Sequence, residues 1–117
     1  MMNLLFLMLA LYEPLLIAQE PPIRVEGDVA PPEVLRRVEP KLGELLRTRR
    51  TSGVVILEAI IDRQGRVRNA HIVRSPHPPE VNAVFVHAIE QWRFKPATLH
   101  GKPVAVYFTT TILLHPR

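Results

Sequence analysis

The chain has 117 residues, of which 47% are hydrophobic and 22% are charged. This length and composition suit one small folded domain with a short N-terminal segment, and they argue against a disordered chain. No cysteine is present, which excludes disulfides, thiolate metal sites and cysteine nucleophiles. The net charge is +4, but the arginines are spread out, without a helix-turn-helix, zinc-finger spacing or a basic stripe interleaved with aromatic residues. Solvated surface charge is therefore the preferred interpretation, and nucleic-acid binding is not predicted.

An apolar segment occupies residues 1–18. Its main run, residues 2–12, is interrupted by Glu13 and Pro14 and resumes up to Ala18. The run is shorter than the about 20 residues of a membrane-spanning helix, and it is typical of a signal peptide cleaved after Ala18. The alternative is a short membrane anchor that stays attached. Either alternative predicts that the rest of the chain is exported.

Residues 19–33 are rich in proline, with the pairs Pro21-Pro22 and Pro31-Pro32. Paired prolines favour extended geometry, which predicts a linker or arm. The folded domain is predicted at residues 34–117. Its first part, residues 34–50, shows a helical pattern that is broken at Pro40 and stops before a glycine.

Two strands joined by a tight turn are predicted next. Residues 54–61 are nearly all apolar and rich in β-branched side chains, which predicts a central strand covered on both faces, or mostly so. Residues 62–65 end in a glycine that can supply the positive φ of a short hairpin. Residues 66–74 are more polar, and they predict a more exposed returning strand.

A second helix and a long strand complete the pattern. One apolar helical stripe is formed by Val81, Val84, Phe85, Ala88, Ile89 and Trp92. Pro96 prevents the helix from continuing, and Gly101 with Pro103 turns the chain back. Residues 104–114 then alternate with a period of two, which predicts a strand. The order helix, strand, strand, helix, strand predicts an α+β fold, a small three-stranded antiparallel sheet with two helices on one face.

No arrangement of residues points to catalysis or to a bound cofactor. The five histidines do not pair with one another or with a carboxylate at metal-ligand spacing. The glycines between the predicted elements are isolated, so no phosphate-binding loop is present, and Ser75 has no glycine elbow around it. We therefore predict no enzyme and no catalytic, cofactor-binding or metal-binding residues. A small exported enzyme stays as an alternative that a hydrolytic or metal-dependent activity would support.

The edge of the predicted sheet is the remaining candidate for function. If the strand over residues 104–114 lies at an edge, it can bind an extended peptide by strand addition. In that mode main-chain hydrogen bonds supply affinity, and alternate side chains supply specificity. The alternative is that a neighbouring element or a second copy of the chain covers this edge.

The motif Trp92-Arg93-Phe94-Lys95-Pro96-Ala97, followed by Gly101-Lys102-Pro103-Val104 and a long alternating strand, resembles the C-terminal domain of TonB-type energy transducers. Further matching residues are Pro31-Pro32, Gly53-Val54-Val55, Ile61-Asp62-Arg63-Gln64-Gly65-Arg66-Val67 and Val73-Arg74-Ser75. Each piece alone is weak, but their order and spacing over residues 31–115 are specific.

The resemblance implies a periplasmic domain that binds a peptide of an outer-membrane TonB-dependent transporter by strand addition, in support of energy-coupled transport. It implies a peptide-binding edge at Val104, Val106, Tyr107, Phe108, Thr109, Thr110, Thr111 and Ile112. The motif residues Trp92, Phe94, Pro96, Gly101 and Pro103 are expected to build the fold, with the two aromatic side chains in its core. An inner-membrane, proton-driven motor complex is a further implied partner, and a homodimer is a candidate assembly.

Two features favour a second hypothesis. The linker over residues 19–33 is short beside the long spacers of such transducers, and residues 1–18 lack the histidine that couples well-known members to their motor. The alternative function is therefore a secreted TonB-like protein–protein or self-association module that is not coupled to a motor. A retained anchor would favour the transducer, and cleavage after Ala18 would favour the free module.

Overall fold

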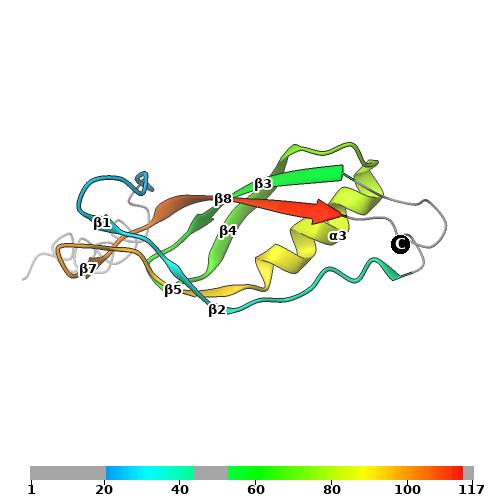
Figure 1. Ribbon diagram of the computed structural model, residues 1–117. Helices are drawn as coiled ribbons and strands as arrows, with labels where there is room; N and C mark the ends of the chain where they lie inside the picture. The colour runs from blue at the N-terminus through cyan, green and yellow to red at the C-terminus, as the bar shows by residue number, and fades with distance from the viewer. Residues whose placement is uncertain (1–20, 44–52, 115–117) are drawn as a thin grey trace, which may run out of the picture.

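A computed structural model describes residues 21–43 and 53–114 (Figure 1). The predicted leader or anchor at residues 1–18 lies outside the described residues. The elements in chain order are β1 (Val29–Ala30), β2 (Glu33–Arg36), β3 (Gly53–Ile61), β4 (Val67–Arg74), α3 (Pro79–Glu90), β5 (Arg93–Lys95), β6 (Thr98–Leu99), β7 (Lys102–Pro103) and β8 (Val106–Leu114). No helix in the described part of the chain is long and apolar enough to cross a membrane.

The main sheet has the strand order β4-β3-β8, and both of its strand pairs are antiparallel. Helix α3 covers one face of this sheet, as Figure 1 shows. Two smaller sheets, β1-β6-β7 and β2-β5, lie beside it and are also antiparallel. The α+β class is therefore confirmed, with more strands than the sequence predicted.

The predicted helix over residues 34–50 is wrong at its start. Residues 33–36 form strand β2, which pairs with β5, and residues 37–42 contain no helix. The physical reason is that β5, directly after the Trp92 turn, needs a backbone partner, and β2 supplies it. The side chain of Leu35 in β2 is 69% exposed, so no apolar helical stripe is buried there. The rest of the predicted helix, residues 44–50, lies outside the described residues, and α3 is the one complete helix within them.

Strand β3 is central, as predicted, but only one of its faces is buried. Its side chains alternate between buried and half-buried or exposed, with Val55, Leu57, Ala59 and Ile61 on the core face. The side chains of Ile56 and Ile60, on the opposite face, are half-buried, and no helix among residues 21–43 and 53–114 covers them. The near-continuous apolar run predicted that both faces of β3 would be covered, or mostly so, whereas the structure buries only one of them.

The core lies between the sheet and α3, and the predicted anchors Trp92 and Phe94 are part of it. The indole N–H of Trp92 donates a hydrogen bond of 2.9 Å to the carbonyl oxygen of Val38, and the guanidinium of Arg37 lies 4.8 Å from the centre of its ring. Phe94 meets Phe108 edge-on, with 5.0 Å between ring centres. The Trp92 motif therefore ties the segment after β2 to the main sheet.

The β3–β4 turn is organised by the carboxylate of Asp62. Its Oδ1 accepts hydrogen bonds of 2.9 Å from the backbone N–H groups of Gln64 and Arg66, and its Oδ2 lies 3.0 Å from Nε of Arg68. Partial burial raises the pKa of Asp62, but the hydrogen bonds from Arg66, Arg68 and Gln64 outweigh it, so the pKa lies below its ordinary value. The charged carboxylate therefore stabilises the folded turn.

Asp62→Asn should make the stability of the domain less sensitive to acid. Because the folded-state pKa is lowered, the charged carboxylate stabilises the fold above the unfolded-state pKa of about 3.9 and loses this effect as the pH falls through the folded value. The variant should be less stable than the wild type at neutral pH, and the difference should shrink below about pH 4. Urea unfolding at several pH values, followed by the fluorescence of the single tryptophan, measures this. Asp28→Asn, at an exposed turn, is the control, and a difference that does not change with pH would contradict the expectation.

Candidate functional site

The outer edge of β8 is the most regular free strand edge among residues 21–43 and 53–114. Strand β8 pairs with β3 from Val106 to Leu114 without a register shift. The opposite edge strand, β4, has two register irregularities against β3, and its Asn69 has a φ of 50°. Such irregularities disfavour the addition of a further strand. The β8 edge is therefore the better place for an incoming strand.

Backbone groups alternate between the two sides of a strand, and one contact fixes which groups of β8 point outward. The backbone N–H of Tyr107 donates to the carbonyl oxygen of Ile23, on the side away from β3, at 3.1 Å. The N–H and C=O groups of Thr109, Thr111 and Leu113 therefore face the same outer side. No strand in the described ranges pairs with them. These three residues offer main-chain donors and acceptors to a partner.

The side chains of β8 also alternate. Tyr107, Thr109, Thr111 and Leu113 are exposed on the open face of the sheet, whereas Val106 is fully buried and the other side chains are half-buried on the core side. The predicted set therefore divides in two. Val106, Phe108, Thr110 and Ile112 belong to the core face, and Tyr107, Thr109 and Thr111 lie on the open face.

Val104 does not belong to the edge strand. Strand β8 begins at Val106, and the backbone N–H of Val104 donates a hydrogen bond of 2.9 Å to the carbonyl oxygen of Ala97. The physical reason is that the β6–β7 hairpin uses this part of the chain before β8 begins, with His100 and Gly101 at positive φ in its turn. The predicted turn at Gly101 and Pro103 is therefore present, and it removes Val104 from the site.

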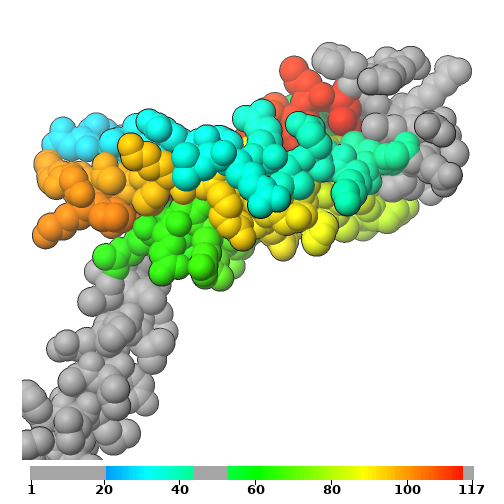
Figure 2. Space-filling view, turned by 90° about the horizontal axis from the view of Figure 1, so that it is seen from below, coloured from blue at the N-terminus to red at the C-terminus, as the bar shows by residue number. Residues whose placement is uncertain are grey.

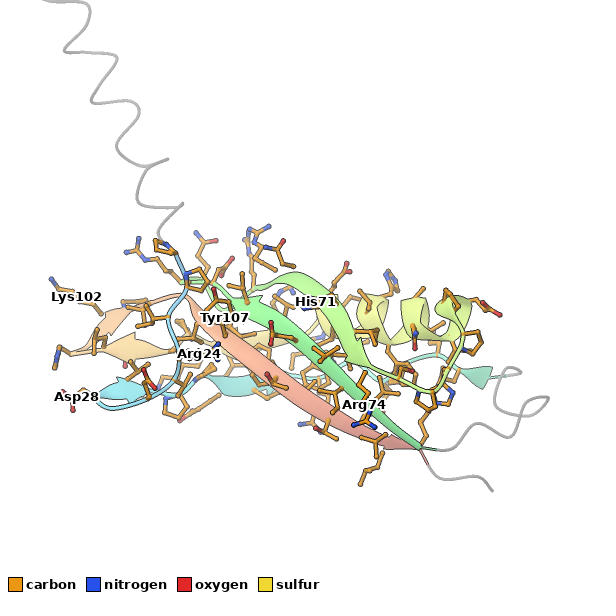
Figure 3. The ribbon with its side chains drawn as sticks, turned by 90° about the horizontal axis from the view of Figure 1, so that it is seen from above. Arg24, Asp28, His71, Arg74, Lys102 and Tyr107 are labelled. Atoms are coloured by element: carbon orange, nitrogen blue, oxygen red, sulfur yellow. The ribbon has the colours of Figure 1, made fainter. Side chains whose placement is uncertain are left out.

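The open face beside the edge is basic and partly apolar. Cross-strand rows place Tyr107 beside Ile60, which pairs with Arg68, and Thr111 beside Ile56, which pairs with Arg74. Figure 3 shows Tyr107, His71 and Arg74 along this face.

Between these two rows, His71 lies 3.7 Å from the carboxylate of Glu58, measured from Nε2. At the far end Leu113 is 61% exposed and Val54 is 42% exposed. This face suits an extended segment that carries apolar or acidic side chains.

The N-terminal arm was expected to be an extended linker, but it also contacts the site. Residues 21–43 run along the molecule from the β6–β7 hairpin towards α3, as the space-filling view in Figure 2 shows. Ile23 forms a parallel bridge with Val106 at the start of β8. The proline pairs signalled extended backbone, but no local sequence signal indicated which strand the arm would meet.

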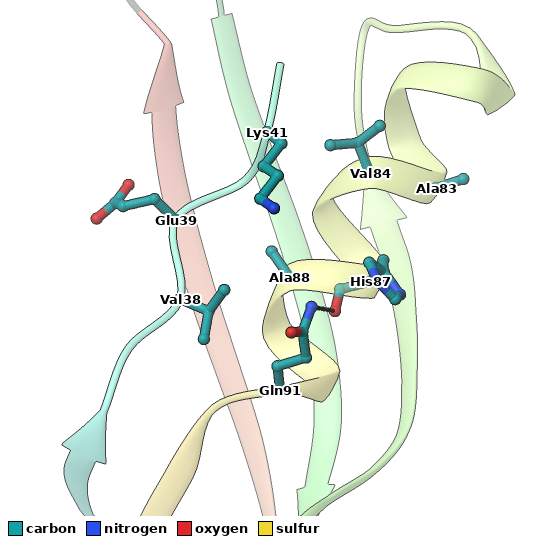
Figure 4. A pocket seen from close by; sticks show the side chains of 8 residues that line it. All are labelled: Val38, Glu39, Lys41, Ala83, Val84, His87, Ala88 and Gln91. Carbon is teal, nitrogen blue, oxygen red and sulfur yellow. Dashed lines mark hydrogen bonds between the residues drawn. The ribbon is translucent and has the colours of Figure 1, made fainter. Parts of the chain in front are cut away.

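A second candidate is the groove between the segment after β2 and α3, with a volume of about 390 Å³ (Figure 4). Its lining residues are Val38, Glu39, Lys41, Ala83, Val84, His87, Ala88 and Gln91. The side-chain amide of Gln91 donates a hydrogen bond of 3.0 Å to the backbone carbonyl of His87 at its rim. The lining of the groove includes Lys41, two residues before the described segment ends at Gly43. Across the described ranges, no group of three or more possible metal-ligand side chains is gathered.

Three comparisons relate the chain to known proteins. The family model for the Gram-negative bacterial TonB protein C-terminal region matches residues 38–113. Protein TonB of Vibrio cholerae serotype O1 is 32% identical over 75 residues, which cover 64% of this chain and 31% of that protein. The chain thus aligns with less than a third of that relative's length.

The solution NMR structure of the Pseudomonas aeruginosa TonB CTD matches with a TM-score of 0.59 and 23% identity, over 77% of this chain and 88% of that one. This likeness shows the same fold. Because the family model matches more than half of the chain, from Val38 in the segment after β2 to Leu113 in β8, the chain belongs to the TonB C-terminal family.

Proposed function

We propose that this chain is a TonB-like periplasmic domain that binds a peptide of an outer-membrane transporter by adding it as a strand to the outer edge of β8. The binding supports energy-coupled transport across the outer membrane, and the domain acts by binding rather than by catalysis. The observation that carries the proposal is the regular β8 edge, where Thr109, Thr111 and Leu113 turn their backbone groups outward. Family membership supports the TonB-like role.

The outer edge of β8 and the open face beside it suit a peptide that carries apolar or acidic side chains. A typical main-chain hydrogen bond contributes only about 1 kcal/mol net, so the backbone alone gives weak binding. Additional affinity and specificity then come from the open face, where Tyr107 offers an aromatic ring and Arg74 a positive charge. Residues 1–18 either tether the domain to the inner membrane, where a proton-driven motor can act on it, or are removed by cleavage.

Self-association is a second candidate, favoured by one observation. Leu113 and Val54 are exposed apolar side chains on neighbouring strands at the far end of the same edge. Two copies that paired through their β8 strands would place Leu113 of one copy beside side chains of the other. A dimer that forms in the absence of peptide and is lost in Leu113→Glu would support this candidate.

Proline at Thr111 tests strand addition. Thr111→Pro removes an outward N–H and leaves the pairing with β3 in place, because proline is tolerated on the free side of an edge strand. Binding of synthetic peptides, taken from the periplasmic N-terminal segments of TonB-dependent transporters of the same organism, should weaken about fivefold, or about 1 kcal/mol, the contribution of one hydrogen bond. Fluorescence anisotropy measures the Kd.

Thr111→Val is the matched control, because it keeps the N–H and the β-branched shape, and its Kd should stay within about twofold of the wild type, less than the effect of one lost hydrogen bond. Circular dichroism checks that both variants fold. Equal affinity of Thr111→Pro and wild type would show that peptides do not add to β8. Absence of binding to the wild-type chain would remove the proposed function.

A further inference from the structure

The start of the β8 edge is already occupied by the chain itself. The backbone N–H of Ile23 donates a hydrogen bond of 2.9 Å to the carbonyl oxygen of Ala105, and its carbonyl oxygen accepts the 3.1 Å bond from the N–H of Tyr107. Ile23 and Val106 form a parallel bridge. These are the contacts that the first residue of an added strand would make.

A side-chain contact adds to this pairing. The guanidinium of Arg24 lies 5.5 Å from the centre of the Tyr107 ring, and Figure 3 shows the two side chains together on the open face. Ile23 is half-buried against the edge of the core. The pairing stops there, because Val25 and Glu26 are exposed and the chain turns at Gly27, where φ is 58°. The contact is therefore short and lies at the molecular surface.

The residues after the Gly27 turn are held by contacts of their own. After the turn, β1 is held separately by its pairing with β6. The turn is closed by a hydrogen bond of 3.1 Å from the N–H of Val29 to the carbonyl oxygen of Glu26. Only the residues before this turn need to move to free the N–H of Tyr107 and the carbonyl oxygen of Ala105.

We propose that residues 22–24 form an internal strand cap that competes with an added peptide for the first pairing position on the outer edge of β8. The inference rests on the proposed function of that edge. With the cap in place, a peptide reaches only the outward groups of Thr109, Thr111 and Leu113. With the cap released, it also pairs with Tyr107 and Ala105, so the arm sets how much of the edge is available.

The double variant Ile23→Pro with Arg24→Ala opens the cap in the full chain. Proline removes the N–H that binds Ala105, and alanine removes the cation that lies over Tyr107. Two measurements follow. Amide hydrogen exchange of Tyr107 by NMR, without peptide, should be at least about tenfold faster than in the wild type. The Kd for the transporter peptides should fall about fivefold, because the competitor is gone.

Val25→Ala is the control, because it alters the same arm at an exposed position that makes no bridge to β8. It should leave both measurements unchanged. The single variant Arg24→Ala should shift both in the same direction as the double variant, by a smaller factor, and it keeps the Ile23 backbone bonds. If the double variant bound the transporter peptides with unchanged or weaker affinity, the proposal that residues 22–24 compete with the peptide would be wrong. The proposed function of the β8 edge would still stand. If no peptide bound either protein, the proposed function would fail and the competition would fail with it.

Discussion

Gly65→Ala is expected to lower the free energy of unfolding by about 3–5 kcal/mol, or to prevent folding. Gly65 has a φ of 81°, and a Cβ at this position would overlap the backbone carbonyl group of Phe94. The same two residues share a hydrogen bond of 2.9 Å, from the N–H of Phe94 to the carbonyl oxygen of Gly65. The β3–β4 turn and β5 would have to separate, because a backbone group cannot rotate away as a side chain does. Urea unfolding measures the loss.

Gly101→Ala is a matched control for that experiment. Gly101 has a φ of 82°, nearly the value at Gly65, but nothing lies within 4 Å of a Cβ built there. Its substitution carries only the conformational penalty of a left-handed residue, about 1–2 kcal/mol. The difference between the two variants therefore isolates the contact with Phe94. Equal losses in the two variants would show that the turn and β5 are not packed as described.

Phe85→Ala should have the other large effect, a loss of about 3–5 kcal/mol in the free energy of unfolding. Phe85 is the largest fully buried side chain among the described residues, and it lies on the face of α3 that packs against the sheet. Its removal leaves a cavity that the backbone of α3 and β3 can fill only in part. The fluorescence of the single tryptophan in urea titrations reports the transition.

Val86→Ala, one position further along α3, is the control. Its side chain is half-buried, and alanine has a higher helix propensity than valine, so the loss should stay below about 1 kcal/mol. Similar losses for Phe85→Ala and Val86→Ala would contradict the assignment of the buried face of the helix. The pair therefore tests which side of α3 meets the sheet.

The sequence alone determined the local elements of this protein. A nearly continuous apolar run rich in β-branched residues indicated β3, and an alternating pattern indicated β8. The turn that ends at Gly65 indicated the hairpin, and the apolar stripe ending at Trp92 indicated α3. These features could be predicted because each depends on the spacing of neighbouring side chains and on turn residues that few amino acids can replace. The resemblance carried by the Trp92 motif indicated the family, which the family model confirms.

Only the tertiary structure decided how these elements use their free backbone groups. Strand β2 formed in place of a helix because β5 required a partner far away in sequence. Val104 is not part of the edge strand, because its N–H donates to the carbonyl oxygen of Ala97. The N-terminal arm pairs with the start of β8 through the backbone of Ile23. Pairings of this kind join segments that are distant along the chain, and no local pattern encodes which partner is chosen. The sequence therefore indicated that an edge strand exists, and the tertiary structure determined which part of it is free.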